Sequence, residues 1–324
     1  MRIAVIGAGS FGQNHLRVVS QSPRAKLVAA VDLDAGRAAK AAEQYSCQAL
    51  TDWREVASIA DAAIIATPTT THAEIGCGLL EAGLHCLVEK PITPDLDSAN
   101  RLIDAAHSAG RVLAVGHLER FNPAVMALRE VATLPLFFEI HRMNLFQPRS
   151  LDVDVVLDLM IHDLDIVLML VGAMPEEVRA AGIRILSERV DIANVRLAFA
   201  NGCIANITAS RVSTERVRKL RLFQPHQYIS IDYGRQDGVV ISMGEQRQIG
   251  FCPLAVTKQE PLAAQLETFL DAMEGKPAPI VTGKDALAAL EVSLDILAKI
   301  EKHAEVVNRT LAGSNLGEAP GVPS

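Results

Sequence analysis

The stretch IAVIGAGSFG, residues 3–12, decides the fold of this chain. Four apolar residues run directly into three glycines with the spacing Gly-x-Gly-x-x-Gly. This spacing permits a tight turn from a strand into a helix, whose N-terminus presents backbone N–H groups to a pyrophosphate. A second apolar run ends at Asp32, twenty residues after Gly12, where a carboxylate can accept hydrogen bonds from ribose hydroxyls. The predicted dinucleotide contacts in this stretch are Gly7, Gly9, Ser10, Phe11 and Gly12.

The negative charge of Asp32 predicts a preference for NAD over NADP. A carboxylate at this place repels the additional 2′-phosphate of NADP. Two cations, Arg37 and Lys40, follow on the next expected helix, where each either reaches a phosphate or is a solvated surface charge. NAD is therefore the expected cofactor, and a glycine-rich turn without any ligand is the alternative.

Short apolar runs alternate with helix-length segments as far as about residue 118. The expected strands are Ile3–Ile6, Leu27–Val31, Ala62–Ala66, Cys86–Val88 and Val112–Val115. Strands that are apolar throughout and separated by helices indicate a parallel sheet covered on both faces. The sequence therefore predicts an α/β fold that begins with a doubly wound Rossmann domain over residues 1–118.

The pattern changes after Asn122-Pro123, where an α+β domain over residues 119–310 is expected. Its predicted helices are Ala124–Ala132, about Val153–Val171, about Leu262–Met273 and Lys284–His303, and a polar loop is predicted at Asn144–Ser150. Its predicted strands are Phe137–His141, Val178–Ile185, Ala193–Phe199, Cys203–Ser210, Arg216–Phe223, Tyr228–Asp232 and Val239–Met243. Asn201-Gly202 indicates a hairpin in which both residues have positive φ. We expect a predominantly antiparallel sheet and a frayed tail at residues 311–324.

Composition and charge argue against several classes of function. The 324 residues are 49% hydrophobic and carry a net charge of −7, which disfavours a nucleic-acid partner. No apolar run approaches the roughly 20 residues that span a bilayer, and the N-terminus lacks the pattern of a signal peptide, so we expect a cytoplasmic protein. The five scattered cysteines indicate reduced thiols rather than a disulfide framework or a zinc site. Aromatic residues make up only 4%, so a small-molecule site should rely on hydrogen bonds and charge.

Three further segments, read with the glycine turn, carry a family resemblance. They are ATPTTTH at residues 66–72, VEKP at residues 88–91 and GHLERFNP at residues 116–123. With these motifs the chain resembles the glucose-fructose oxidoreductase/inositol dehydrogenase family, called Gfo/Idh/MocA, over nearly its whole length. The resemblance implies that the cofactor is also contacted by Thr67, Pro68, His72, Glu89, Lys90 and Arg120. Lys90 additionally ends a predicted parallel strand at its carboxyl edge, where open α/β sheets bind ligands.

A predicted apolar helix carries Asp158, His162 and Asp165, which at about 100° per residue share one face. Polar side chains on an apolar helix are costly to bury without partners, so they are candidates for a site; the alternative is a satisfied polar stripe on a core helix. An Asp/His pair can also chelate a metal, but no further Cys or His cluster supplies ligands, so no metal is expected. In the resembling family an Asp-x3-His pair faces the nicotinamide beside the motif lysine. The usual glycines around that pair are replaced here by Val155-Val156-Leu157.

These residues predict how a secondary alcohol would be oxidised. His162 is the expected base, because its ordinary pKa lies near neutrality. Lys90 is expected to stabilise the developing alkoxide, and Asp158 to orient the pair. Arg120 and Asn122 are expected to contact cofactor or substrate, with a structural hydrogen-bonded corner as the alternative. His117 and Asp163 have weaker claims to a role.

A basic segment points to the class of substrate. Residues 211–221 contain five cations against one acid, so they form either a solvated stretch or a phosphate contact through Arg211. The segments at 116–123 and 157–165 resemble the family branch that oxidises UDP-N-acetylglucosamine at its 3-hydroxyl. This resemblance implies a UDP-sugar substrate, contacted by Asn122, Asp165 and Arg211, and a role in lipopolysaccharide or lipid A biosynthesis.

Two other functions are compatible with the sequence. One is oxidation of a free polyol or sugar, as in inositol or glucose dehydrogenases. The other is a dinucleotide-bound regulatory protein without chemistry, which the presence of Lys90 and the Asp/His pair disfavours. Family members commonly pair through the outer face of the second sheet, so the resemblance implies a homodimer or homotetramer.

Overall fold

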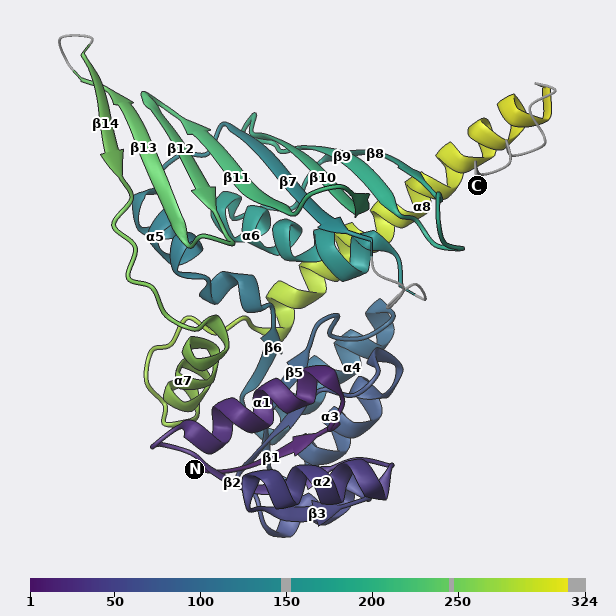
Figure 1. Ribbon diagram of the computed structural model, residues 1–324, viewed down its shortest axis with the longest axis vertical. Coiled ribbons are helices and arrows are strands. Elements are labelled where there is room, and N and C mark those ends of the chain that lie inside the picture. Colours follow the sequence, from purple (N-terminus) through teal and green to yellow (C-terminus); the bar gives the residue numbers. More distant parts are fainter. Residues whose placement is uncertain (147–152, 245–247, 314–324) are drawn as a thin grey trace. The chain divides into compact units, whose positions relative to one another are not determined.

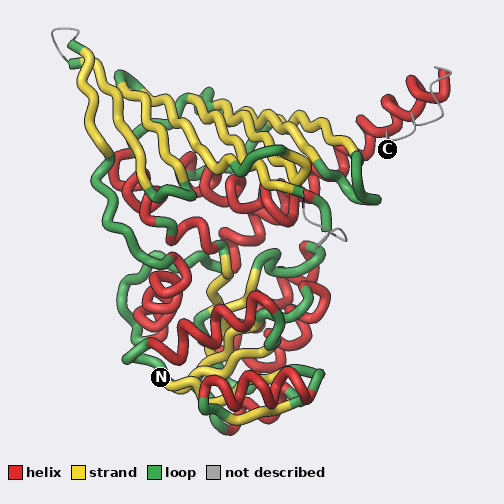
Figure 2. The backbone as a smooth tube through the Cα atoms, in the orientation of Figure 1, coloured by secondary structure: helices red, strands yellow, loops and turns green. Residues whose placement is uncertain are grey.

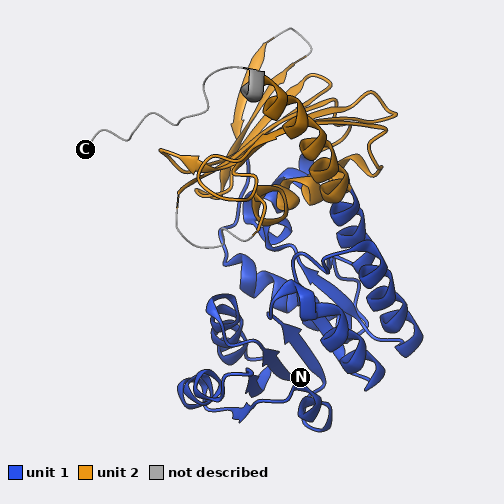
Figure 3. Cartoon of the chain, turned by 90° about the vertical axis from the view of Figure 1, so that its right-hand side faces the viewer, with its two compact units in different colours: residues 1–131, 254–291 blue, residues 132–253, 292–324 orange. Residues whose placement is uncertain are grey.

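The structure is a computed structural model that describes residues 1–146, 153–244 and 248–313. Contacts divide the chain into two compact units, shown in blue and orange in Figure 3. Unit 1 comprises residues 1–131 and 254–291, and unit 2 comprises residues 132–253 and 292–324. The sequence predicted one boundary near residue 118, whereas unit 1 also takes up residues 119–131 and a segment from late in the chain.

Unit 1 contains a six-stranded parallel sheet with the order β3-β2-β1-β4-β5-β6 (Figure 1). Its strands are β1 Arg2–Ile6, β2 Lys26–Val31, β3 Gln48–Leu50, β4 Ala62–Ile65, β5 His85–Glu89 and β6 Leu113–Gly116. Five of these strands were predicted and are confirmed to within a residue or two. The short β3 was missed, because two of its three residues are exposed and it has no apolar run. The strand order reverses at β1 and β4, the topological switch point at which doubly wound sheets bind ligands.

Helices cover both faces of this sheet. They are α1 Ser10–Gln21, α2 Ala35–Tyr45, α3 His72–Glu81, α4 Leu96–Ala109 and α7 Pro261–Met273, with short 3-10 turns η1 Trp53–Ser58, η2 Thr69–Thr71 and η3 Leu118–Phe121. Helix α5 Pro123–Val131 follows η3 and contacts it. Helix α2 begins at a capping residue, Asp34, whose side chain accepts a hydrogen bond from the Arg37 N–H. Helix α4 is capped in the same way by Asp95 and ends at Gly110, whose φ of 60° suits glycine.

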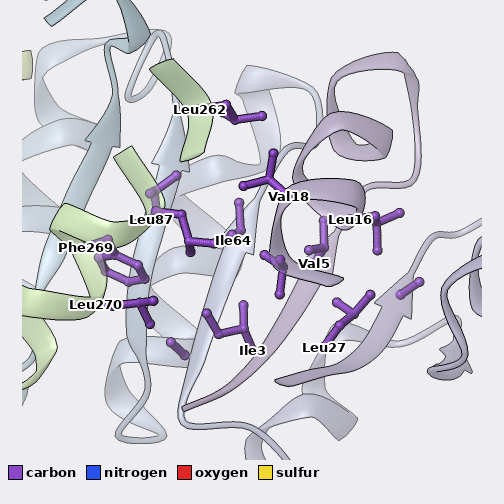
Figure 4. Close-up of a cluster of buried hydrophobic side chains, with 14 of the residues drawn as sticks. Ile3, Val5, Leu16, Val18, Leu27, Ile64, Leu87, Leu262, Phe269 and Leu270 are labelled. Atoms are coloured by element: carbon purple, nitrogen blue, oxygen red, sulfur yellow. The ribbon is translucent and has the colours of Figure 1, made fainter. Parts of the chain in front are cut away.

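Helix α7 explains why a late segment belongs to unit 1. Leu262, Phe269 and Leu270 pack into the core cluster formed by β1, β4, β5 and α1 (Figure 4). Burial of one large apolar side chain contributes about 1.5–3 kcal/mol, so three such residues dock the helix firmly. A backbone hydrogen bond of 2.9 Å from Val115 N to Val281 O adds the following segment to the edge of β6.

Unit 2 contains an eight-stranded sheet, drawn in yellow in Figure 2, with the strand order β14-β13-β12-β11-β7-β10-β9-β8 that the labels of Figure 1 show. Its strands are β7 Phe137–Leu145, β8 Glu177–Ile183, β9 Ile192–Ala198, β10 Ile204–Ser213, β11 Val217–Gln224, β12 Gln227–Asp232, β13 Asp237–Met243 and β14 Ile249–Pro253. Every neighbouring pair is antiparallel except β7 and β10. The predominantly antiparallel sheet is therefore confirmed. Helix α6 Ile161–Val171 and the part of α8 Gly283–Gly313 beyond residue 291 lie on one face of it (Figure 1).

Several local predictions for unit 2 were wrong. Only Gly202 has a positive φ, of 84°, because Asn201 instead turns its side-chain oxygen back to accept a hydrogen bond from Cys203 N. Strand β7 continues to Leu145, into the predicted loop, whose remaining residues 147–150 lie outside the described ones. Strand β14 was missed because all of its residues are exposed. Helix α8 runs on to Gly313, and the rest of the predicted tail is not described.

Candidate active site

The glycine turn after β1 has the geometry of a phosphate cradle. Gly7 has a φ of 95°, and a Cβ there would lie 2.4 Å from Ala66 O. A Cβ on Gly12 would lie 1.7 Å from Gly7 O, whereas a Cβ on Gly9 would meet nothing within 4 Å. Gly9 is the N-cap of helix α1 and provides no side-chain hydrogen bond, so the first N–H groups of the helix have no side-chain cap, which suits the binding of a phosphate there.

Replacing Gly12 by Ala is expected to lower the apparent melting temperature and to abolish measurable NAD binding, because the new methyl group collides with Gly7 O. Overpacking of this kind costs about 1–3 kcal/mol or more. Gly9→Ala is the matched control: it should leave the melting temperature unchanged and weaken NAD alone, since its methyl group enters open space. Thermal unfolding and calorimetric titration separate the two effects, and a Gly12→Ala protein with normal NAD affinity would contradict this account of the turn.

A cavity of about 780 Å³ opens next to this turn. It is lined by the ends of β1, β2 and β4 and by the η1 turn, with Gly7, Gly9, Asp32, Thr67, Pro68 and Trp53 among its lining residues. A cavity of this size lies within the range of small-molecule and cofactor sites. Because it joins the open space at Gly9 to the acid at the end of β2, it fits the pyrophosphate and adenosine parts of a dinucleotide.

Asp32 is held in place from three directions. Its Oδ2 accepts a 2.9 Å hydrogen bond from Ala8 N, and its Oδ1 accepts one of 2.9 Å from Asp34 N and one of 2.8 Å from Arg37 Nη2. Burial by itself raises the pKa of this carboxyl, but the hydrogen bonds outweigh burial and place the pKa below its ordinary value. Asp32 is therefore an anion at neutral pH, as the predicted preference for NAD requires.

His72 joins the two motif loops that follow β4 and β5. Its ring is buried, with Nε2 at 2.9 Å from Thr67 O and Nδ1 at 3.1 Å from Pro91 O. Burial lowers the pKa of this histidine, although the carbonyl groups act in the opposite direction. Through these contacts His72 fixes the position of Thr67 relative to the Lys90-Pro91 turn. The predicted contact of His72 with the cofactor stays a prediction.

The buried Glu89 side chain holds the backbone of Lys90 in place. Its Oε2 accepts a 3.3 Å hydrogen bond from Lys90 N, and its Oε1 lies 2.7 Å from Nε2 of His15 on α1, with both side chains buried. A Cβ on Gly116 would come within 2.7 Å of the Glu89 carboxyl, so a larger residue there would displace this carboxyl from its place beside His15. Lys90 itself is partly exposed, forms a cis peptide bond with Pro91 and stands at the carboxyl end of β5, where a ligand-binding lysine is expected.

The segment after β6 forms a hydrogen-bonded corner. Asn122 Oδ1 accepts a 3.1 Å hydrogen bond from Ala124 N at the start of α5, and Asn122 Nδ2 donates one of 3.2 Å to Glu119. Arg120 lies 3.7 Å from Asp285, and His117 is buried. These contacts support the structural alternative for Asn122, and the ligand contacts of Arg120 and Asn122 stay predictions.

The predicted long helix of unit 2 is interrupted where the candidate residues lie. Val156–Met160 form a π-helical turn, η4, in which Ile161 N bonds to Val156 O, and regular α-helix begins at Ile161. Such turns are frequent at functional sites and change the angular spacing, so the 100° rule does not apply across Asp158 and His162. Asp158 and His162 are partly exposed, whereas Asp165 is buried. Asp165 therefore differs in environment from the other two.

Asp163, on the other side of the helix, is a packing residue. It accepts hydrogen bonds of 2.7 and 2.8 Å from the guanidinium of Arg142 on β7, and one of 3.2 Å from the Tyr233 hydroxyl. Asp163 and Arg142 are 0% and 2% exposed. This bidentate pair ties α6 to the sheet.

Arg211 is part of a second buried ion pair. Its Nε lies 3.1 Å from Asp191, and its Nη2 donates hydrogen bonds of 2.6 and 2.9 Å to Val153 O and Val190 O. Asp191 in turn accepts hydrogen bonds from the backbone of residues 185–187. These contacts place Arg211 against the segment that leads into η4, and its predicted contact with a substrate phosphate stays a prediction.

The sequence analysis missed three residues near the site. Trp53 and Arg54 line the cavity, with the Arg54 guanidinium 4.5 Å above the indole ring. The sequence did contain a signal for the η1 turn that carries Trp53 and Arg54. Asp52 caps this turn and is followed three residues later by Glu55, a spacing typical of the start of a helix. His15 was missed because only the fold brings α1 to the end of β5.

Within the described residues, no cluster of three or more His, Cys, Asp or Glu side chains could hold a metal ion. No helix in that same part of the chain is long and apolar enough to cross a membrane.

Comparisons with known proteins agree with this geometry. Residues 1–117 match the Gfo/Idh/MocA model described as an oxidoreductase family with an NAD-binding Rossmann fold, and residues 139–226 match the C-terminal domain model of the same family. A UDP-N-acetylglucosamine 3-dehydrogenase of Acidithiobacillus ferrooxidans is 36% identical over 93% of this chain and 97% of the relative. An inositol 2-dehydrogenase of Rhizobium meliloti is 28% identical over 90% and 94% of the two chains.

The solved structures show the same relationship. A structure of UDP-N-acetylglucosamine 3-dehydrogenase from Acidithiobacillus ferrooxidans superposes with a TM-score of 0.88 at 35% identity, covering 94% of this chain and 98% of that one. The glycine turn and the acid at the end of β2 have the placement typical of dinucleotide-binding Rossmann folds, and the role of the lysine at the end of β5 stays a prediction. The chain therefore belongs to the Gfo/Idh/MocA family of NAD-binding oxidoreductases.

Proposed function

We propose that this chain oxidises the 3-hydroxyl of UDP-N-acetylglucosamine, or of a closely related UDP-sugar, and transfers the hydride to NAD. The observation that carries this proposal is the 36% identity to a UDP-N-acetylglucosamine 3-dehydrogenase over 97% of that enzyme, which spans both units of this chain. Likeness limited to residues 1–117 would support only cofactor binding. The similarity to this enzyme also extends over unit 2, which is the part of the chain expected to bind the substrate.

The proposed chemistry assigns one task to each catalytic residue. His162 takes the proton of the sugar hydroxyl, since imidazole is the side chain suited to this transfer near neutral pH. Lys90 donates a hydrogen bond to the same oxygen and stabilises its developing negative charge. Asp158 orients His162 and favours its protonated form. The bound nicotinamide supplies the hydride acceptor.

The structure describes contacts that hold Lys90 and the segment that leads to Asp158. The Lys90 backbone is hydrogen-bonded to Glu89, and the neighbouring Pro91 carbonyl contacts His72. Asp158 lies in the η4 turn, and Arg211 contacts the backbone just before that turn. Arg211 is therefore proposed as a positioning residue as well as a phosphate contact, with Asn122 and Asp165 as further substrate contacts.

Oxidation of a free polyol is the second candidate function. The inositol 2-dehydrogenase of Rhizobium meliloti covers nearly as much of the chain, although at 28% identity. A scyllo-inositol 2-dehydrogenase (NAD(+)) of Bacillus subtilis is 29% identical over 91% of this chain. These enzymes share the family's fold and act on a ring hydroxyl, so the choice depends on whether a diphosphate is recognised.

A substrate panel tests the proposal. The purified chain is mixed with NAD or NADP and with UDP-N-acetylglucosamine, UDP-N-acetylgalactosamine, UDP-glucose, N-acetylglucosamine or myo-inositol, and formation of reduced cofactor is recorded. The highest kcat/KM is expected with UDP-N-acetylglucosamine and NAD, and N-acetylglucosamine without UDP should react far more slowly. Faster turnover of myo-inositol would favour the second candidate, and no reduction with any compound would reject a dehydrogenase of these substrates.

The proposed product is a 3-keto sugar nucleotide, which an aminating enzyme can consume. We place the chain accordingly in the cytoplasm, where NAD and nucleotide sugars are available, in a route to lipopolysaccharide or lipid A. A homodimer or homotetramer is proposed on the family resemblance. Size-exclusion chromatography with light scattering checks the oligomeric state.

A further inference from the structure

The fold distributes the cations of the basic segment, residues 211–221, among different environments. Arg211 lies in the buried ion pair described above, and Arg216 is exposed and precedes β11. The other three cations of the segment lie in β11 and are Arg218, Lys219 and Arg221. Successive side chains of a strand point to opposite faces of the sheet, so each of these cations can be assigned to a face.

Arg218 lies on the face of the sheet that helix α6 covers. Leu220 and Leu222 share its face, and both are 0% exposed. Lys219 and Arg221 alternate with these residues and lie on the opposite face, where Lys219 is exposed. The Nε atom of Arg218 is buried, although the residue as a whole is partly exposed. Arg218 is thus the cation of β11 that is directed to the side of α6.

The position of Arg218 next to α6 follows from the strand register. Arg218 stands directly opposite Arg142 in the antiparallel pair of β11 and β7. Side chains opposed in this way share a face, with their Cβ atoms about 4.5–5.5 Å apart. Arg142 in turn makes its two hydrogen bonds to Asp163, the residue that follows His162 on α6. Because Asp163 neutralises Arg142, Arg218 supplies the net positive charge of these three side chains.

The distance from Arg218 to the other proposed catalytic residue suits the size of a sugar nucleotide. The η4 turn, which carries Asp158, packs against β10, and β7 separates β10 from β11 in the sheet. Neighbouring strands are about 4.8 Å apart, so β10 and β11 are separated by about 10 Å. In a UDP-sugar the diphosphate is attached to C1 of the ring whose 3-hydroxyl would react. A ring held at η4 and α6 can therefore extend its diphosphate towards β11.

We propose that Arg218 is a specificity-determining residue that binds the diphosphate of the nucleotide-sugar substrate. A guanidinium carries a planar set of donors that suits phosphate oxygens, and its charge attracts the negative charges of the diphosphate. A free polyol has no such group, so Arg218 favours a UDP-sugar over a free ring. This inference rests on the proposed function, and it adds Arg218 to the phosphate contact proposed for Arg211.

Binding of UDP alone tests the proposal without any turnover. Calorimetric titration in the presence of NAD gives the Kd for UDP in the wild type, Arg218→Met and Lys219→Met. Arg218→Met should weaken UDP binding about ten- to a hundredfold, the size expected for lost hydrogen bonds to a charged group. Lys219→Met is the matched control, because it removes one charge from the neighbouring position of β11 on the opposite face. It should leave the Kd for UDP unchanged.

Steady-state kinetics separate a diphosphate contact from a structural role. Arg218→Met should raise KM for UDP-N-acetylglucosamine by about the same factor and change kcat less than about threefold, because the contact is equal in the ground state and the transition state. The kcat/KM for N-acetylglucosamine without UDP should change less than about threefold. Arg218→Lys should recover part of the affinity for UDP, because lysine keeps the charge but lacks the planar set of donors.

Three outcomes would overturn this inference alone. They are an unchanged Kd for UDP in Arg218→Met, an equal loss in Lys219→Met, and equal losses of kcat/KM for UDP-N-acetylglucosamine and N-acetylglucosamine in Arg218→Met. If Arg218→Met does not fold, Arg218→Lys decides, and a wild-type Kd for UDP in that variant would contradict the need for a guanidinium.

Two further outcomes separate the failure of this inference from that of the proposed function. A wild-type protein that oxidises myo-inositol but binds no UDP would overturn both the inference and the UDP-sugar substrate. If UDP binding depends on Arg218 while no sugar is oxidised, the diphosphate site is supported and the proposed function fails.

Discussion

Replacing Lys90 by Met is expected to lower kcat for sugar oxidation by about a thousandfold, while the Kd for NAD changes less than about threefold. The lysine ammonium is proposed to stabilise charge that develops on the sugar oxygen only in the transition state. Methionine has similar length and no charge, and Lys90 is held through backbone contacts that the substitution leaves in place. Steady-state kinetics and calorimetric titration of NAD measure the two quantities separately.

Lys40→Met is the matched control for Lys90→Met, because it removes the same charge from an exposed position on α2. It should retain full activity.

His162→Ala should lower kcat as Lys90→Met does, and raising the pH should recover part of it, because the higher concentration of hydroxide can then take the proton that the imidazole no longer takes. A Lys90→Met protein with normal kcat would remove the lysine from the mechanism, whatever the substrate.

Replacing Asp163 by Ala is expected to destabilise unit 2 by about 3–5 kcal/mol, because the buried charge of Arg142 loses its carboxylate. The Arg142 guanidinium makes two hydrogen bonds of 2.7 and 2.8 Å to Asp163 and lies 4.9 Å from the Tyr233 ring centroid. Neither charged side chain is more than 2% exposed, so water cannot replace the lost partner. Thermal and urea unfolding, followed by circular dichroism, measure the effect.

The control for Asp163→Ala is the exposed ion pair on the same strand, β7. Glu139 lies 3.0 Å from Arg221, with the side chains 38% and 34% exposed, so Glu139→Ala should cost less than about 1 kcal/mol. The double variant Arg142→Met, Asp163→Leu should recover much of the stability, since an apolar pair needs no charged partner. Equal losses in Asp163→Ala and Glu139→Ala would show that burial does not decide the strength of these pairs.

The sequence predicted the Rossmann part of unit 1 closely because its signals are local. Apolar runs marked five of the six parallel strands, and the glycine spacing marked the turn whose space at Gly9 is open. The three-residue strand β3 has no such run. The place of α7 in the core of unit 1 depends on contacts between residues far apart in the chain, such as Phe269 with the first strands, which no local pattern reveals.

The candidate site was predictable in its residue types and less so in its environments. Lys90, Asp158 and His162 were assigned from motifs, and their roles stay predictions. The π-helical turn at Asp158 has no local signal in an apolar run such as Val155-Val156-Leu157. The burial of Asp163 and Arg211 depends on partners, Arg142 and Asp191, that lie about twenty residues away in sequence. Charge patterns show that a cation is present, and only the fold shows what it contacts.

Transfer of deuterium from the sugar to the cofactor tests the central claim most directly. UDP-N-acetylglucosamine carrying deuterium at C3 is incubated with NAD and the purified chain, and the reduced cofactor is examined by mass spectrometry and NMR. The account predicts one deuterium per NADH, at C4 of the nicotinamide, together with a slower rate than for the unlabelled sugar. NADH that forms without deuterium, or no NADH at all from this substrate, would contradict it.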